Sequence, residues 1–367
     1  MHHINLIFQH IFLLPQERFE KLQHIMFNDK SQEFFMKKFL TFLLTAALAL
    51  STFTACGNSE NSNLTKVTLS EVAHSLFYAP MYVAIEEGYF EEEGIDLELV
   101  TAFGADKVTT AVISGEADIA FMGSESTIYV YNQNADDYLV NFAQLTQRAG
   151  NFLVSREPMD KFQWNDLKGT NVLGGRKGGM PQMVFEYVLK KHGIDPQKDL
   201  TIDQSIDFGS TAAAFSGGKG DFTVEFEPSA TALEMEGAGH VVASLGEASG
   251  YVPYTAFSAR KSYLAEHPEI IQSFTDALQK GMDFCNTHTP EEIAAIIQPQ
   301  FAETDISQIT AIVKRYHDQD TWKENLIFEE DAFTLLQNIL MEAGELDSFV
   351  PYEELVDKTY AANAFSK

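Results

Sequence analysis

The sequence predicts an α/β fold built from two similar halves and a helical C-terminal region. Short apolar runs of strand length alternate with helical segments over residues 67–245, as they do where helices connect the strands of parallel sheets. The segment Ser114-Gly-Glu-Ala-Asp118 recurs as Gly217-Gly-Lys-Gly-Asp221, each time after a helix and before a buried strand. The alternative is a coincidence between two similar turns. From Lys261 onward, amphipathic helical patterns replace the alternation.

In the first half, strand and helix signals follow one another in short order. Residues 95–100 alternate apolar and polar side chains, which is typical of a half-buried strand, and residues 105–114 have a helical pattern. A helix is expected over 79–90, ending near Gly88. The remaining strands of this half are expected at 67–73, 117–122, 139–145 and 152–154.

The second half repeats this order, and helices alone follow it. Its strands are expected at 171–173, 200–202, 222–224 and 240–245, with helices at 181–192 and after Pro228. In the C-terminal region, Pro268 and Pro290 suit the first turn of a helix, because proline has no backbone N–H to leave unpaired there. The helices of this region are expected at 261–285, 290–299, 305–318 and 329–343.

The N-terminal residues predict an exported protein. Met36-Lys-Lys38 precedes an apolar run at 39–50, and small residues follow up to Cys56, as in a secretory signal peptide. The run is shorter than the about 20 residues that a membrane-spanning helix needs. Phe53-Thr-Ala-Cys56 resembles a bacterial lipobox, which implies that a lipid on Cys56 anchors the chain to the outer face of the cell membrane. The alternative is a secreted protein with a free thiol.

These features divide the N-terminal region into three expected parts. Residues 1–35 do not have the pattern of a signal peptide, so we interpret them as a gene-model extension upstream of a start at Met36. Residues 36–55 form the signal peptide. Residues 56–65 are polar, as a flexible tether to the membrane would be.

Composition excludes several classes of function. The chain carries 25 Lys and Arg against 53 Asp and Glu, a net charge of −28, which argues against nucleic acid as a partner because Lys and Arg hold a phosphate backbone. With two Cys and ten scattered His, no cluster has the spacing of a metal site. The loop Gly174-Gly-Arg-Lys-Gly-Gly179 lacks the spacing of nucleotide-binding loops. We therefore expect no metal, no cofactor and no nucleic acid.

Three motifs together resemble one protein family. The stretch Tyr78-Ala-Pro-Met-Tyr-Val-Ala-Ile-Glu-Glu-Gly-Tyr-Phe90, continuing Glu-Glu-Glu-Gly-Ile-Asp-Leu-Glu-Leu99, is similar to the opening of ABC-transporter solute-binding proteins of the nitrate/sulfonate/taurine and thiamine-pyrimidine-precursor family. Residues 114–120 resemble the next block of that family, and Gly169 to Gly175 resembles the entry into its second lobe. The resemblance covers roughly residues 66–285.

The resemblance implies a two-lobed, type 2 periplasmic-binding-protein-like fold. Lobe one would comprise residues 66–155 and 256–345, lobe two residues 156–255, and residues 346–367 a C-terminal tail. It further implies an extracytoplasmic receptor that captures a small molecule between its lobes and delivers it to an ABC permease and its ATPase. We expect a monomer, which the lipid on Cys56 would anchor to the membrane. The alternatives are a sensor module on the same fold, or a pyrimidine synthase, although relatives of that kind carry a cysteine-rich iron site that this chain lacks.

Loops after the predicted strands supply the candidate ligand residues. In such folds the loops at the carboxyl ends of the strands form the ligand site, and helix starts there can hold an anion, although Ser124, Ser210 and Thr211 could equally be plain helix caps. His74 could donate to a ligand or serve only as a structural donor. The candidates are His74, Ser75, Phe77, Tyr78, Phe103, Gly104, Gly123, Ser124, Glu125, Arg176, Gly178, Gly179, Ser210, Thr211, Glu225, Phe226 and Glu227.

The acids and aromatic rings among these candidates favour one class of ligand. Glu125, Glu225 and Glu227 would repel a sulfonate or nitrate, whereas a nitrogen heterocycle can donate to a carboxylate. Phe77, Tyr78, Phe103, Phe226 and Tyr254 could stack on a flat ring or simply pack in a core. Each Glu could instead lie at a solvated rim or pair with Arg148, Arg176 or Lys177. The sequence thus favours a thiamine pyrimidine precursor or similar heterocycle, with an alkanesulfonate, taurine or nitrate as the alternative.

Overall fold

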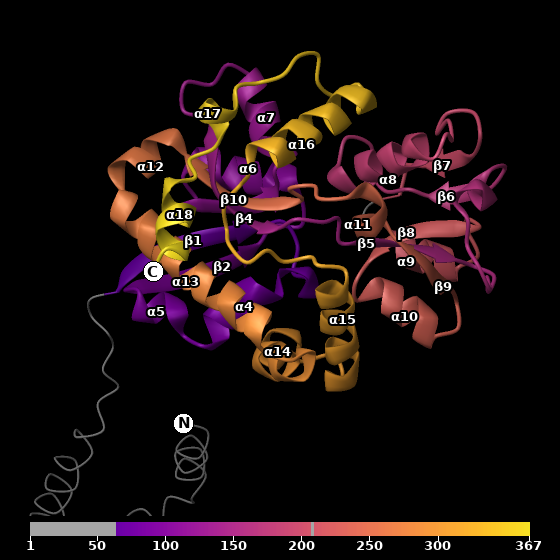
Figure 1. The fold of residues 1–367 in the computed structure, drawn as a ribbon, viewed down its shortest axis with the longest axis horizontal. Coiled ribbons are helices and arrows are strands. Elements are labelled where there is room, and N and C mark those ends of the chain that lie inside the picture. The colour runs from indigo at the N-terminus through magenta and orange to yellow at the C-terminus, as the bar shows by residue number, and fades with distance from the viewer. Residues whose placement is uncertain (1–63, 207–208) are drawn as a thin grey trace, which may run out of the picture. The chain divides into compact units, whose positions relative to one another are not determined.

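The computed structural model describes residues 64–206 and 209–367. The expected extension, signal peptide, lipidated Cys56 and most of the tether lie outside the described residues. The described chain contains two five-stranded sheets, with strand orders β2-β1-β3-β10-β4 and β7-β6-β8-β5-β9 (Figure 1). We call each sheet with the helices packed on it lobe one and lobe two, respectively.

Lobe one begins with β1, which pairs in parallel with β2 and β3. In order along the chain, its first elements are β1 (Thr65–Glu71), the 3-10 helix η1 (Leu76–Tyr78), α4 (Ala79–Glu86), α5 (Tyr89–Glu92), β2 (Ile95–Thr101), α6 (Ala105–Ser114), β3 (Ile119–Gly123), α7 (Glu125–Asn132) and β4 (Leu139–Thr146). β10 (Thr255–Arg260) completes its sheet.

Lobe two is formed by the middle of the chain. Its elements are β5 (Asn151–Ser155), η2 (Trp164–Leu167), β6 (Asn171–Leu173), α8 (Met180–Lys191), β7 (Thr201–Asp203), α9 (Thr211–Ser216), β8 (Phe222–Phe226), α10 (Ser229–Met235), β9 (His240–Ser244) and α11 (Leu245–Ser249). β5 belongs to this sheet, so the boundary between the lobes precedes Asn151 rather than following Ser155.

The C-terminal region is helical, as expected. It contains α12 (Lys261–Glu266), α13 (Pro268–Thr287), α14 (Pro290–Ile297), η3 (Gln298–Phe301), α15 (Ile306–Asp318), α16 (Glu330–Ala343), α17 (Tyr352–Leu355) and α18 (Thr359–Phe365). α13 packs against α4 so closely that a Cβ at Gly281 would lie 2.2 Å from the carbonyl oxygen of Pro80. The expected C-terminal tail forms α17 and α18, and α18 packs on α13 and β4.

Both sheets are mixed, whereas the sequence predicted parallel sheets. β10 runs antiparallel to β3 and β4, and β5 runs antiparallel to β8 and β9. These two strands follow the crossovers at residues 147–150 and 250–254, where the chain passes between lobes, and each enters its new sheet in the reverse direction. The sequence analysis did not predict β10 as a strand.

Two expected helices are divided at residues that oppose helical geometry. The helix expected over 79–90 ends at Glu86, and α5 begins after Gly88, whose φ of 73° lies in the left-handed region. The helix expected over 261–285 is interrupted at His267, because the residue before a proline disfavours the helical conformation. The loop after the strand expected at 117–122 is short, because Glu125 already begins α7, and Ser124 lies at the cap position of that helix without a side-chain capping bond.

The repeated Asp motif has the same structure in both lobes. Asp118 accepts a hydrogen bond from the backbone N–H of Thr68 at 2.8 Å, and its own N–H donates to the Thr68 carbonyl at 2.9 Å. Asp221 makes the same pair of bonds with Asn171, at 2.8 and 2.7 Å. Each Asp thus joins the first parallel strand of its lobe to the strand that follows the repeat, so the recurrence is structural rather than coincidental.

Candidate ligand site

The predicted ligand loops gather at the carboxyl ends of the parallel strands of both sheets. In lobe one, η1 follows β1, α6 follows β2 and α7 follows β3; in lobe two, α8 follows β6, α9 follows β7 and α10 follows β8 (Figure 1). The crossover residue Pro253 contacts the loop after β3, and Gly150 lies so close to η1 that a Cβ there would lie 2.6 Å from the Phe77 ring. Tyr316 donates to the carbonyl of Gly150 at 2.9 Å, and the Ser124 hydroxyl donates to the carbonyl of Pro253.

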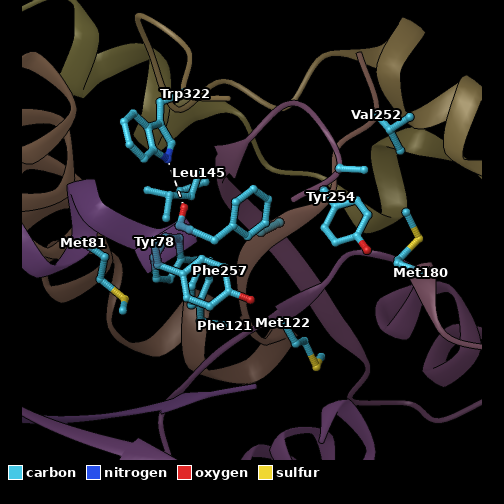
Figure 2. Close-up of a cluster of buried hydrophobic side chains, with 14 of the residues drawn as sticks. Tyr78, Met81, Phe121, Met122, Leu145, Met180, Val252, Tyr254, Phe257 and Trp322 are labelled. Atoms are coloured by element: carbon cyan, nitrogen blue, oxygen red, sulfur yellow. Dashed lines mark hydrogen bonds between the residues drawn. The ribbon is translucent and has the colours of Figure 1, made fainter. Parts of the chain in front are cut away.

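An aromatic cluster connects the two lobes. The ring of Phe77, in η1, lies with its centroid 6.0 Å from that of Phe226 and 5.8 Å from that of Tyr254. Phe226 and Tyr254 lie 6.1 Å apart, and Tyr78 lies 5.3 Å from Phe77. Figure 2 shows Tyr78 and Tyr254 in one buried cluster with Met180, the first residue of α8. Four of the five predicted aromatic residues therefore come together here.

Glu125 is a buried carboxyl group next to this cluster. Its side chain is almost fully buried, and among the described residues no group donates to its Oε2. Burial raises its pKa to about 7. Burial is the main cause that raises the pKa of Tyr78 and of Tyr254. The charge of Glu125 adds to this pKa shift in both residues, after that of Glu71 in the case of Tyr78. Gly123 permits this geometry, because a Cβ there would lie 2.2 Å from the Glu125 carboxylate.

Two further buried polar groups near the cluster lack partners within the described residues. Neither amide atom of Asn151 makes a hydrogen bond, although the residue is fully buried, and the Tyr254 hydroxyl is also unpaired. Asn151 begins β5 and lies opposite Phe226 in the sheet register. Because buried polar groups are normally paired, these atoms are candidate contacts for a bound molecule. Sequence reasoning missed Asn151, and its position just after a crossover was the only signal for it.

Glu225, in lobe two, is also buried, but threonine hydroxyls contact it. Thr223 donates to its Oε1 at 2.6 Å. Burial raises the pKa of Glu225 to about 7, against the hydrogen bonds from Thr223 and from Thr211, the first residue of α9. The structure therefore brings together the predicted Thr211 and Glu225. Ser210 precedes them as an exposed helix cap and makes no side-chain capping bond.

Glu227 is paired within the protein, and with none of the expected residues. Arg315, on α15, forms an ion pair with its Oε1, while Thr231 donates its N–H to Oε2 at 2.9 Å and its hydroxyl to Oε1 at 3.0 Å. Burial raises the pKa of Glu227, and Arg315 opposes that shift. Arg315 lies 88 residues further along the chain, so local sequence gave no signal for it. The backbone carbonyl of Glu227 accepts from Ser75 of lobe one at 3.3 Å.

His74 has protein partners on both ring nitrogens. Its Nδ1 lies 2.9 Å from Oε1 of the buried Glu71, and its Nε2 lies 2.9 Å from the carbonyl of Gln300 in η3. The ring also stacks on Phe301. Burial lowers the pKa of His74, but the hydrogen bonds to Glu71 and Gln300 outweigh it, and the pKa is raised. These contacts match the interpretation of His74 as a structural donor.

The other predicted residues lie outside the aromatic cluster. Phe103 is 72% exposed and has a φ of 54°, and Gly104 caps α6. Arg176 of lobe two is exposed and lies 3.8 Å from Asp106 of lobe one. Gly178 accepts from the Tyr129 hydroxyl at 3.2 Å, another contact between lobes, and Gly179 caps α8. Arg176 and Gly178 therefore lie at the junction of the lobes.

Two open cavities lie apart from the predicted residues. One, of about 770 Å³, is lined by residues of both crossovers and of the start of α16, including Gln147, Tyr251 and Glu330. The other, of about 320 Å³, lies beside α15 and is lined by Phe152, Lys314 and others. Neither contains a predicted ligand residue, and neither carries the unpaired buried groups Glu125, Asn151 and Tyr254, so we place the candidate site at the aromatic cluster.

The described part of the chain shows neither a metal centre nor a membrane helix. Over residues 64–206 and 209–367, no three His, Cys, Asp or Glu side chains are arranged to hold a metal ion. Within the same ranges no helix is long and apolar enough to cross a membrane. Cys285 is buried, and burial raises the pKa of its thiol.

A family model described as "NMT1/THI5 like" matches residues 77–293, more than half of the chain. The chain belongs to this family. Its matched region includes the aromatic cluster, Glu125, Asn151, Glu225 and Tyr254, so the candidate site lies within the part that defines the family.

Known proteins agree with this membership and with the fold. YtlA of Bacillus subtilis (strain 168), named as a candidate binding protein, is 46% identical over 85% of this chain and 93% of its own. A 4-amino-5-hydroxymethyl-2-methylpyrimidine phosphate synthase of Schizosaccharomyces pombe is 25% identical over 33% of this chain and 34% of its own. The alkanesulfonate-binding protein SsuA of Xanthomonas axonopodis pv. citri, bound to MOPS, has a TM-score of 0.66 at 15% identity, over 81% of this chain and 100% of that one. At that identity, the likeness shows the two-lobed periplasmic-binding-protein fold alone.

Proposed function

We propose that this protein is the extracytoplasmic solute receptor of an ABC importer, and that it captures a nitrogen heterocycle between its lobes. A thiamine pyrimidine precursor is the type of ligand we favour. The observation that carries the proposal is the buried carboxyl of Glu125 beside the aromatic cluster, whose Oε2 has no partner within the described residues, together with the unpaired side chains of Asn151 and Tyr254. A receptor function needs a site between two lobes that a solute can hold together, and it needs no catalytic group.

The chemistry of the unpaired groups fits a heterocycle that carries an amino group. A carboxyl at Glu125 can accept from an exocyclic amine or a protonated ring nitrogen, and the Asn151 amide can both donate and accept. The rings of Phe77, Phe226 and Tyr254 offer apolar surface to a flat molecule. The relative that is named as a synthase of 4-amino-5-hydroxymethyl-2-methylpyrimidine phosphate supports this class of ligand, although it matches only part of the chain.

The same groups disfavour an anionic ligand. In the described residues Glu125 forms no ion pair, so an anion placed beside it would meet a carboxyl group without a neighbouring cation. Arg315, the arginine nearest to the predicted acids in the hydrogen-bond network, is already bound to Glu227 and Glu234. A sulfonate or nitrate would therefore raise the electrostatic energy of the site rather than lower it.

Anchorage and delivery complete the proposal. A lipid on Cys56 and the polar residues after it would hold the receptor at the outer face of the cell membrane, beside a permease and its ATPase. The relative named as a binding protein, identical at 46% of matched positions, supports a receptor rather than an enzyme. We propose a monomer, because one chain contains both lobes and both crossovers.

A thermal-shift screen of the purified protein tests this function. The library holds thiamine, its pyrimidine precursors, riboflavin, purines, taurine, alkanesulfonates, nitrate and polyamines. A solute that binds only the folded state raises the melting temperature by mass action. We expect a shift with an aminopyrimidine. A shift with sulfonates or nitrate alone would contradict the role given to Glu125 and would support the alternative ligand class.

A further inference from the structure

The C-terminal turn of α15 contacts the segments that carry the ligand-site residues of lobe two. Arg315 forms ion pairs with Glu227, just after β8, and with Glu234 of α10 at 2.9 Å. Glu234 in turn accepts from the N–H of Val241, in β9, at 3.0 Å. Through these two carboxylates one guanidinium holds the loop after β8, the helix that follows it and a neighbouring strand.

The residues beside Arg315 bind the first crossover and the same loop. The hydroxyl of Tyr316 donates to the carbonyl of Gly150 and accepts from the backbone N–H of Glu227 at 3.3 Å. One turn later, Gln319 donates to the carbonyl of Ala149 at 3.2 Å and accepts from Ser244 at 2.7 Å. Tyr316 is fully buried and Gln319 nearly so, which makes these bonds part of the protein interior.

α15 is at the same time attached to lobe one. It packs against α14 and against η1, and the ring of Tyr316 lies 5.1 Å from that of Phe77. Trp322, after α15, donates its indole N–H to the carbonyl of Phe77 at 3.0 Å (Figure 2). The loop held by Arg315 also receives the hydroxyl of Ser75 from lobe one. The helix therefore joins the cluster residue Phe77 to the loop that directly follows Glu225 and Phe226 at the end of β8.

We propose that Arg315 is a positioning residue for the ligand site: by holding Glu227 and Glu234 it fixes the loop after β8 against η1. It touches no solute itself, and it sets solute affinity by holding Glu225 and Phe226 in place when the lobes are together. This inference rests on the proposed function for its effect on affinity, but its effect on the loop is independent of any solute.

Hydrogen–deuterium exchange on the full chain without solute tests the structural step. In Arg315→Met, the amides of Glu227 and Thr231 should exchange about tenfold faster or more, because both bonds depend on the held loop. Amides of β1, which does not contact Arg315, should be unchanged. Lys314→Met is the matched control, since that exposed neighbour pairs only with Asp318 in the same helix. Arg315→Lys, which keeps the charge, should restore part of the protection.

A second variant guards against misfolding. Arg315→Met leaves Glu227 buried without its cation, which can unfold a protein. Arg315→Met combined with Glu227→Gln removes both charges, and in that variant the amide of Glu227 should still exchange faster than in Glu227→Gln alone. Equal exchange at Glu227 and Thr231 in the wild type and Arg315→Met would overturn the proposal. If Arg315→Met does not fold, equal exchange at residue 227 in the double variant and in Glu227→Gln would overturn it.

Calorimetric titration with 4-amino-5-hydroxymethyl-2-methylpyrimidine tests the functional step. We expect Arg315→Met to bind about 10- to 100-fold more weakly than the wild type, the size of an ordinary coupling between sites, and Lys314→Met to bind equally well. Equal affinity in Arg315→Met would overturn the link to affinity. If the wild type does not bind this pyrimidine, the proposed ligand class fails, while the exchange experiment still decides whether Arg315 holds the loop.

Discussion

The two lobes share one strand order and differ in how the acids near the end of their third parallel strand are paired. In lobe one, Asp118 joins β1 to β3, and in lobe two Asp221 joins β6 to β8 by the same bonds. Yet Glu125, which follows β3, has an unpaired buried oxygen, whereas Glu227, which follows β8, is held by Arg315 and Thr231. The fold thus determines where these acids lie, and distant side chains determine which of them is free to meet a solute.

This difference assigns separate roles to the two acids. Burying a carboxyl group without a neighbouring cation destabilises the folded protein, and carboxyl groups perturbed in this way are concentrated at functional sites. A buried carboxyl with an arginine and two further hydrogen bonds is part of the framework. We therefore expect substitutions at Glu125 to change binding, and substitutions at Glu227 or Arg315 to change the loop.

The largest expected effect concerns the pH dependence of stability. The pKa of Glu125 rises from 4.5 to about 7 on folding, which corresponds to about 3 kcal/mol at about 1.4 kcal/mol per unit. Because the folded state holds the proton more tightly, stability should be full below about pH 4.5 and fall as pH rises to about 7. Glu125→Gln should remove this loss and be more stable than the wild type at pH 8.

Denaturant unfolding at pH 4 and pH 8 measures this effect. The two proteins should have similar free energies of unfolding at pH 4 and should diverge at pH 8. Glu225→Gln is the comparison in lobe two, where burial also raises the pKa to about 7. If the free energy of unfolding changes between pH 4.5 and 7 by the same amount in the wild type and in Glu125→Gln, the Glu125 carboxyl ionises in the folded protein without destabilising it. That result would contradict the prediction.

A smaller effect should test the equivalence of the lobes. Asp118→Ala and Asp221→Ala each remove a carboxylate that accepts from a backbone N–H, and each should lower the free energy of unfolding by about 1–2 kcal/mol. The loss should be larger for Asp118, because Asp221 is more exposed to water. Urea unfolding of both variants provides the measurement, and a large loss in one with none in the other would break the equivalence.

The smallest expected effect concerns a bond between the lobes. Ser75 donates to the carbonyl of Glu227 at 3.3 Å, a long hydrogen bond between neutral groups. Ser75→Ala should weaken solute binding by about 0.5–1 kcal/mol, the ordinary net value of such a bond, and leave the exchange of the Thr231 amide unchanged. Calorimetric titration with the aminopyrimidine would measure it. A loss as large as that of Arg315→Met would mean that Ser75, rather than the ion pair, holds the loop.

Sequence reasoning predicted most elements of the fold, since the apolar alternation and the Asp motif are local signals. It predicted helix 105–114 and strand 171–173 with the bounds observed. It predicted a strand at 152–154, within β5, but it could not predict the reversed direction of β5 and β10, because strand direction follows from the crossovers between lobes and not from any residue within the strand.

The candidate site was predictable in part for the same reason. Phe77, Tyr78 and Glu125 lie within a few residues after a strand, and Phe226 ends one, so local position identified them. The roles of His74 and Glu227 depend on Gln300 and Arg315, which are distant in sequence and meet them only through the helical C-terminal region. Asn151 has no motif of its own. Its unpaired amide is visible only once burial and hydrogen bonding are known.

The most direct test of the account is calorimetric titration of the wild type and of Glu125→Gln with 4-amino-5-hydroxymethyl-2-methylpyrimidine and with MOPS, the sulfonate bound by a structural neighbour. The account predicts that the wild type binds the pyrimidine and that Glu125→Gln binds it about 10- to 100-fold more weakly, as expected for loss of a buried charged hydrogen bond. Binding of MOPS alone, or equal affinity of both proteins for the pyrimidine, would contradict the claim that the unpaired carboxyl of Glu125 selects the solute.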